Sequence, residues 1–186
     1  MALNEFVQTA LDEEGYEEGS DGYTKYGSWY GLANADWCVM FISWCANQAG
    51  IMTTSSTGTV PNVPKMASTS AMYTWYTNNR RNLAPSMSAS SPNRLQVGDI
   101  VVINTQNGGP VTDHVGIVVS VDYDAGTADV MEGNRSNKVK KVTYTNLLSA
   151  IRLSIFAAIT RATNIYDMSG SCIVRAAHNL TATQEI

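Results

Sequence analysis

The stretch WCVMFISWCA, residues 37–46, decides how the rest of the sequence is interpreted. Its side chains are apolar on nearly every side of a helix, which is typical of a helix buried in the centre of a domain. Asn34 or Asp36 is suited to cap the start of this helix, and Gly50 stands where a helix C-terminus favours glycine. The sequence therefore predicts a central buried helix over residues 36–49.

The segments on either side of this helix differ in their hydrophobic period. Apolar residues at helical spacing predict an amphipathic helix over residues 2–14 and a weaker helix over residues 65–78. Glycine and aromatic residues between the first two helices indicate an irregular segment, and prolines and serines over residues 80–97 indicate a surface loop. Beyond Gly98, β-branched runs predict strands at residues 99–103, 114–121, 127–134 and 138–144. Helices followed by antiparallel strands predict an α+β fold.

Composition limits the class of protein. Of the 186 residues, 44% are hydrophobic and only 15% are charged, which excludes an intrinsically disordered chain. No apolar run approaches the length of a membrane span, and a net charge of −4 argues against nucleic-acid binding. We expect one domain over residues 1–160 and a C-terminal tail of unassigned role over residues 161–186. Residues 152–159 suit either a helix or a strand.

Cys38 is the first candidate for chemistry. It lies in the first turn of the central helix, where unpaired N–H groups and the helix dipole favour an anion such as a thiolate. The alternative is a small buried apolar side chain, which is the usual role of free cysteine. Cys45 lies on the same helix face about 10 Å away, too far for a disulfide, and is interpreted as structural. Cys172 has no assigned role.

His114 is the candidate base, because a thiol nucleophile needs one. It begins a predicted strand, and the length of the following hairpin loop decides which residue of the next strand lies beside it. A three-residue loop places His114 opposite Ser136 with Asn134 as diagonal neighbour, whereas a five-residue loop places it opposite Asn134 with Glu132 as diagonal neighbour. Either loop puts Glu132 and Asn134 on the face of His114, so either residue is suited to orient the imidazole.

Metal sites have little support in the sequence. Zinc is not expected, because the two histidines and three cysteines lack paired ligand spacing. Acidic residues cluster over residues 12–21, where calcium is a weaker alternative to a solvated face, because their spacing does not follow the calcium-loop pattern.

Four separated motifs and an upstream segment resemble the CHAP domain, the cysteine, histidine-dependent amidohydrolase/peptidase family. The motifs are residues 37–46, GDIV at 98–101, DHVGIV at 113–118 and EGN at 132–134, and the upstream segment is TKYG at 24–27 with WYG at 29–31.

The resemblance implies a papain-like α+β fold, with the cysteine on the central helix and the histidine on an antiparallel sheet. It implies cleavage of amide bonds in peptidoglycan, either between muramic acid and L-alanine or within the peptide stem and cross-bridge. By matching position, Cys38 is the nucleophile, His114 the base, and Glu132 and Asn134 orient and polarise the histidine. The backbone N–H of Cys38 then supplies one oxyanion donor.

Further expectations follow from the resemblance. Tyr26, Trp29 and Tyr30 line the substrate groove or, alternatively, pack against the central helix. The partner is bacterial peptidoglycan, with no nucleic acid, no membrane insertion and no cofactor, and the protein is a monomer. No signal peptide is recognised at the N-terminus, so we expect the protein to reach the wall by phage holin release or by injection. The alternative functions are a thiol amidase or an NlpC-type peptidase on another substrate, and a non-catalytic wall-peptide binding module.

Overall fold

The computed structural model describes the chain over residues 2–57, 62–79, 82–83, 86–103 and 113–145, together with three short strands at residues 155–157, 165–166 and 172–173. The expected helices and strands are found within these ranges.

The helices are α1 (Ala2–Asp12), α2 (Lys25–Tyr30), α3 (Cys38–Gln48) and α4 (Thr69–Asn78), with a 3-10 turn η1 (Ser20–Gly22). Three of them match the predicted helices. The fourth, α2, lies in the segment predicted to be irregular; the Thr24 side chain accepts a hydrogen bond from the N–H of Gly27, and Gly31 ends the helix at a φ of 91°. Within the described residues, no helix has the length and apolarity needed to cross a membrane.

The strands are β1 (Met52–Thr53), β2 (Val63–Pro64), β3 (Asn82–Leu83), β4 (Asp99–Ile103), β5 (His114–Asp122), β6 (Thr127–Glu132), β7 (Lys140–Thr145), β8 (Ile155–Ala157), β9 (Ile165–Tyr166) and β10 (Cys172–Ile173). Six of them form one antiparallel sheet in the order β3-β8-β4-β5-β6-β7. The strand β8 falls inside residues 152–159, so the strand alternative is correct there. The expected papain-like α+β fold is confirmed.

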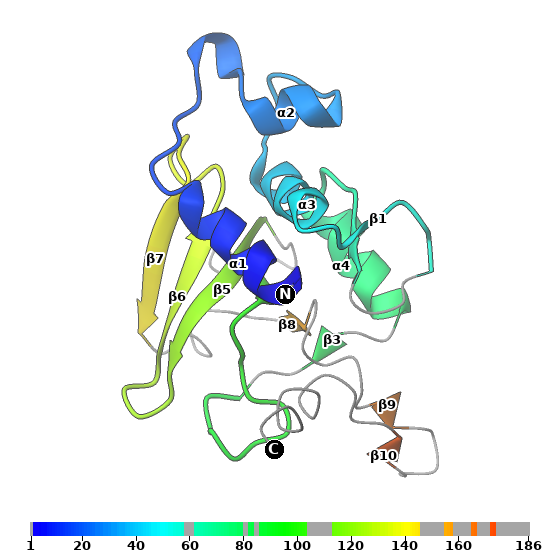
Figure 1. The fold of residues 1–186 in the computed structure, drawn as a ribbon, viewed down its shortest axis with the longest axis vertical. Helices are drawn as coiled ribbons and strands as arrows, with labels where there is room; N and C mark the ends of the chain where they lie inside the picture. The colour runs from blue at the N-terminus through cyan, green and yellow to red at the C-terminus, as the bar shows by residue number, and fades with distance from the viewer. Residues whose placement is uncertain are drawn as a thin grey trace, which may run out of the picture.

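The main core lies between the helices and one face of the sheet. Helix α1 lies against β5, with α3 beside it (Figure 1). Phe6 and Ala10 of α1, Phe41 of α3 and Ile117 of β5 are fully buried together. A second, smaller apolar cluster on the sheet is formed by Leu95, Val101, Ile103, Val118, Ala128 and Val130. The central helix is therefore held by contacts on almost every side, as its composition predicts.

The start of α3 differs from the prediction. Neither Asn34 nor Asp36 caps the helix; the N-cap residue is Trp37, with a φ of −113° and no side-chain capping bond. Trp37 is fully buried, so its packing outweighs the local preference for a small polar cap. The C-terminus follows the prediction, because Gly50 has a φ of 70° and the N–H of Ile51 donates to the carbonyl of Ala46.

The register of the β5–β6 hairpin changes along its length, so neither of the two expected loops predicts it completely. Asp122 pairs with Thr127, so the turn has four residues, and this turn alone would place His114 and Glu132 on opposite faces of the sheet. A bulge between Val118 and Ser120 adds one residue to β5 and shifts the register by one. From there His114 and Glu132 share a face, in the arrangement predicted from a five-residue loop.

Candidate active site

Cys38 is the first residue of α3 and is 5% exposed. Trp37, directly before it, stacks on Tyr26 with ring centroids 5.2 Å apart. The indole Nε1 of Trp37 donates a hydrogen bond of 2.7 Å to Oε2 of Glu18. The chain entering α3 is thus held by a buried ring and a charged hydrogen bond, which fixes the position of the cysteine at the helix N-terminus.

His114 begins β5 and is 8% exposed, and its Nε2 lies 2.9 Å from Oε2 of Glu132. The Cys38 side chain also interacts with the imidazole, and this interaction raises the pKa of His114. The structure therefore groups Cys38, His114 and Glu132, three of the predicted residues.

The environment of His114 strongly perturbs its titration. Burial by itself lowers the pKa of this imidazole, because it disfavours the charged form. The hydrogen bonds and charge interactions with Cys38 and with Glu132 outweigh burial and raise the pKa to about 9. The imidazole is therefore mainly protonated at neutral pH and able to donate a proton.

Glu132 is fully buried, and both of its carboxylate oxygens have partners. Oε2 accepts from His114 and lies 3.6 Å from Nε of Arg135. Oε1 accepts a hydrogen bond from the hydroxyl of Tyr144 in β7. Such contacts are required of a buried carboxylate, because an unpaired charge in the protein interior is very costly.

Asn134 lies in the turn after β6, with a left-handed φ of 59°. Its Nδ2 donates a hydrogen bond of 3.1 Å to Oδ1 of Asp36, two residues before Cys38. Of the two residues expected beside the histidine, Glu132 makes the hydrogen bond to the imidazole. Asn134 instead hydrogen-bonds to Asp36, in the segment that enters α3 and leads to Cys38.

The three aromatic candidates for a substrate groove occupy different environments. Tyr26 is fully buried, and its hydroxyl donates to Oε2 of Glu13, so the expected groove position is wrong for this residue and the alternative of core packing is correct. Burial and the contact with Glu13 raise the pKa of this phenol. Trp29 and Tyr30 are half-buried at the end of α2, with the ammonium of Lys65 over their rings at 4.7 and 5.2 Å. These two rings retain surface that a ligand can touch.

The other cysteines contribute no described contact to this cluster. Cys45 is fully buried, and burial raises the pKa of its thiol well above the usual value. It therefore behaves as a structural residue, as expected. Cys172 and His178 lie where no side chain is described.

The acidic segment between α1 and α2 forms pairs with protein groups. Glu13 contacts Lys25, Glu17 contacts Lys138, and Glu18 contacts Trp37. In the part of the chain that the structure describes, no three histidine, cysteine or acidic side chains group as metal ligands. Calcium binding therefore stays a prediction, and no group of ligands in the described residues indicates where the ion would bind.

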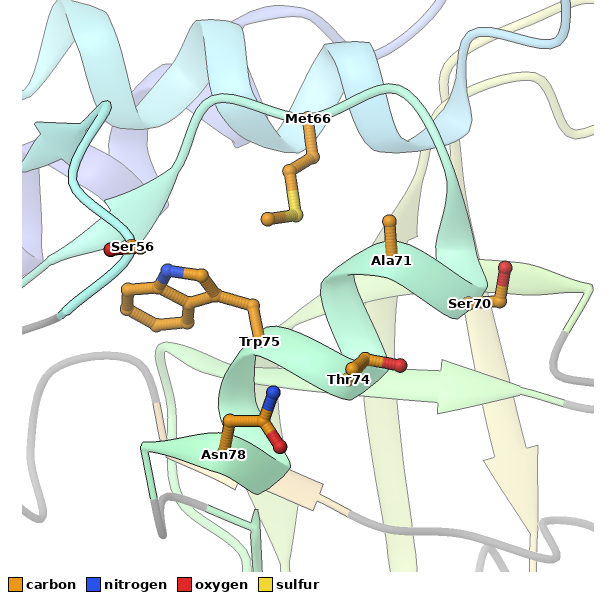
Figure 2. Close-up of a pocket in the computed structure, with 7 residues that line it drawn as sticks. All are labelled: Ser56, Met66, Ser70, Ala71, Thr74, Trp75 and Asn78. Carbon is orange, nitrogen blue, oxygen red and sulfur yellow. The ribbon is translucent and has the colours of Figure 1, made fainter.

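One cavity of the described surface lies beside α4, and another lies beside the start of α3. The cavity beside α4 has a volume of about 460 Å³, and the side chains of Met66 and Trp75 lie near Ala71 there (Figure 2); none of the predicted site residues lines it. The other, of about 510 Å³, is lined by Glu18, Gly22, Asn34, Ala35, Asp36, Asn134 and Asn137. Because it includes Asp36 and Asn134, the second cavity adjoins the segments that carry Cys38 and Glu132.

Sequence reasoning missed two contacts around the site, between Tyr144 and Glu132 and between Asp36 and Asn134. Tyr144 was within a predicted strand, but its approach to Glu132 depends on the β6–β7 register, in which Tyr144 pairs with Ala128. Because side chains alternate between the two faces of a strand, the pairing of Tyr144 with Ala128 places Tyr144 and Glu132 on one face of the sheet. This alternation is the sequence feature that could have indicated the contact. No local pattern marks the bond between Asp36 and Asn134, since 98 residues separate them.

Comparison with known proteins places the chain in a family. The CHAP domain matches residues 29–134, more than half of the chain. No curated protein matches significantly. Two solved structures, of Ly7917 and of Ly7917 with the hydrolyzing product of MDP, each give a TM-score of 0.48 at 18% identity. They cover 84% and 83% of this chain, which spans 62% of the length of each. On the CHAP match over residues 29–134, the chain belongs to the CHAP-domain family.

Proposed function

We propose that this protein is a cysteine hydrolase that cleaves amide bonds of bacterial cell-wall peptide. The observation that carries the proposal is the grouping in which Cys38, at a helix N-terminus, interacts with His114 while Glu132 holds Nε2 of the imidazole. A thiol, an imidazole and a group that orients the imidazole are the parts that nucleophilic amide hydrolysis requires. Membership of the CHAP family supports peptidoglycan as the substrate class.

The reaction follows from these positions. The Cys38 sulfur, whose proton has passed to His114, attacks the amide carbonyl carbon, and the backbone N–H of Cys38 donates to the developing oxyanion. The protonated imidazole of His114 gives its proton to the leaving nitrogen, so the C–N bond breaks and a thioester remains. Neutral His114 then takes a proton from water, which attacks the thioester. The carboxylic acid product leaves, and the deprotonated sulfur of Cys38 and the protonated imidazole of His114 are restored. Glu132 holds the ring throughout.

Substrate enters, in this proposal, along the surface beside the start of α3. The cavity that contains Asp36 and Asn134 adjoins the reactive residues, and the exposed parts of Trp29 and Tyr30 precede Cys38 in the chain. The bond is either the one between muramic acid and L-alanine or one within the peptide stem or cross-bridge. We expect the protein to act as a monomer at the cell wall.

The test is release of free amino groups from purified Gram-positive cell walls, with mass analysis of the fragments. We expect release by the wild type and at least a thousandfold lower rate with Cys38→Ala, because the nucleophile is lost. Cys45→Ala is the matched control, since it removes a thiol from the same helix away from His114. Fragment masses separate amidase from endopeptidase activity.

Three outcomes would contradict the proposal. Equal release by wild type and Cys38→Ala removes the cysteine from the mechanism. Binding of walls without release indicates a binding module. Release only from non-wall amides indicates a different substrate for the same chemistry.

A further inference from the structure

We infer that Tyr144 is a positioning residue for the reaction, acting on His114 through the carboxylate of Glu132. The inference rests on the proposed function, in which His114 transfers protons. Its basis is a continuous line of contacts: the Tyr144 hydroxyl donates to Oε1 of Glu132, and Oε2 of the same carboxylate lies 2.9 Å from Nε2 of His114.

The burial of Glu132 makes its second oxygen important. Its side chain is fully buried, so each oxygen needs a hydrogen-bond partner within the protein. His114 and Arg135 both approach Oε2, and the side chain of Arg135 is 40% exposed and 3.6 Å away. Tyr144 is the partner of Oε1. The two oxygens are thus held from opposite ends, which fixes the rotation of the carboxylate about its last bond.

The surroundings hold Tyr144 and Glu132 in place. Tyr144 packs against the smaller apolar cluster of the sheet, next to its cross-strand partner Ala128. On the other side of Glu132, a Cβ at Gly116 would lie 3.0 Å from Cγ of Glu132, so the glycine leaves the space that this side chain fills. Because Tyr144 and Glu132 are both held by packing, they restrict the orientation of the His114 imidazole more than a solvent-exposed tyrosine and glutamate would.

The groups that face these residues determine what loss of the hydroxyl does. His114 contacts Cys38 from α3 and Glu132 from β6, while Glu132 contacts His114, Tyr144 and Arg135. Burial and Glu132 raise the pKa of Tyr144, so the phenol remains a hydrogen-bond donor across the working pH range. Without the hydroxyl, Oε1 loses its hydrogen-bond donor, the carboxylate is free to rotate, and Oε2 is no longer held against Nε2 of the imidazolium. The pKa of His114 then falls.

The experiment compares Tyr144→Phe with Tyr123→Phe. Tyr123 is also half-buried and donates a hydrogen bond, but to the carbonyl of Leu95 at the far end of β5 from His114. For Tyr144→Phe we expect kcat on cell walls to fall about tenfold with KM changed less than twofold, the effect expected when one buried hydrogen bond is lost. We also expect the pKa of His114, followed by NMR of the imidazole, to fall measurably. Tyr123→Phe should change neither.

A second measurement tests whether Tyr144 acts through Glu132. In a Glu132→Gln background, adding Tyr144→Phe should shift the pKa of His114 no further, because the route from the phenol to the ring is already broken. An unchanged His114 pKa in Tyr144→Phe, or an equal change in Tyr123→Phe, would overturn the inference. The NMR titration needs no turnover, so failure of the positioning role is distinguished from failure of the proposed hydrolase activity.

Discussion

Asn134 combines an unusual backbone with a long-range contact. Its φ of 59° lies in the left-handed region, which asparagine tolerates better than most residues, and its amide reaches Asp36 across the site. Both properties concern the same turn but have different physical origins. Substitution can therefore separate the backbone requirement from the side-chain contact.

We expect Asn134→Gly to be more stable than Asn134→Ala by about 1 kcal/mol, because glycine adopts a positive φ without strain and alanine does not. Both variants lose the bond to Asp36, so both should lower kcat/KM several-fold through the segment that enters α3. Urea unfolding and wall-hydrolysis assays measure the two effects. An alanine variant as stable as the glycine variant would show that the turn changes its backbone conformation.

At the scale of elements, the site depends on how closely the turn after β6 approaches α3. A Cβ built at Gly133 would lie 2.6 Å from Cβ of Phe41, which is closer than side chains pack. The missing side chain lets the end of β6, which carries Glu132, lie directly against the helix that carries Cys38. Gly133 thus sets the distance between the end of β6 and α3, although it is not one of the candidate catalytic residues.

Gly133→Ala should lower the free energy of unfolding by about 1–3 kcal/mol, the usual cost of overpacking, and should reduce turnover as well. Gly19→Ala is the matched control, because a Cβ there meets its nearest neighbour at 3.5 Å and its φ is −79°. Thermal unfolding and wall hydrolysis are measured for both variants. Full activity in Gly133→Ala would mean that the turn and α3 separate without disturbing the reactive groups.

At the scale of the whole molecule, the site contributes to stability in a pH-dependent way. The pKa of His114 is raised from 6.5 in the unfolded chain to about 9 in the folded protein. The folded state therefore binds the proton more tightly. This contribution is fully present below pH 6.5 and is lost as the pH rises through about 9.

We expect the free energy of unfolding of the wild type to fall between pH 6.5 and 9, with His114 contributing on the order of 3 kcal/mol or less. Urea unfolding at several pH values measures the change, and His114→Gln supplies the reference without the titrating group. The difference between the two proteins should shrink across this window. A constant difference would contradict the raised pKa.

The sequence by itself determined the main elements and gave Cys38 and His114 as the candidate reactive pair. The run at residues 37–46 specified α3 because a segment that is apolar all round is stable only when buried. Alternation along β5 and β6 was enough to place Glu132 and Asn134 as candidates beside His114, since side chains in strands repeat with a period of two. The CHAP motifs indicated Cys38 and His114, and the pKa of His114 is raised by its interaction with Cys38.

Only the tertiary structure decided the details on which the chemistry depends. A four-residue turn and a bulge in β5 together select Glu132 as the partner of His114, and no local pattern specified that combination. Packing placed Tyr26 in the core rather than in a groove, and long-range contacts brought Tyr144 to Glu132 and Asn134 to Asp36. Local sequence sets which face a side chain occupies, whereas strand register and the packing of distant segments set which side chains on that face meet.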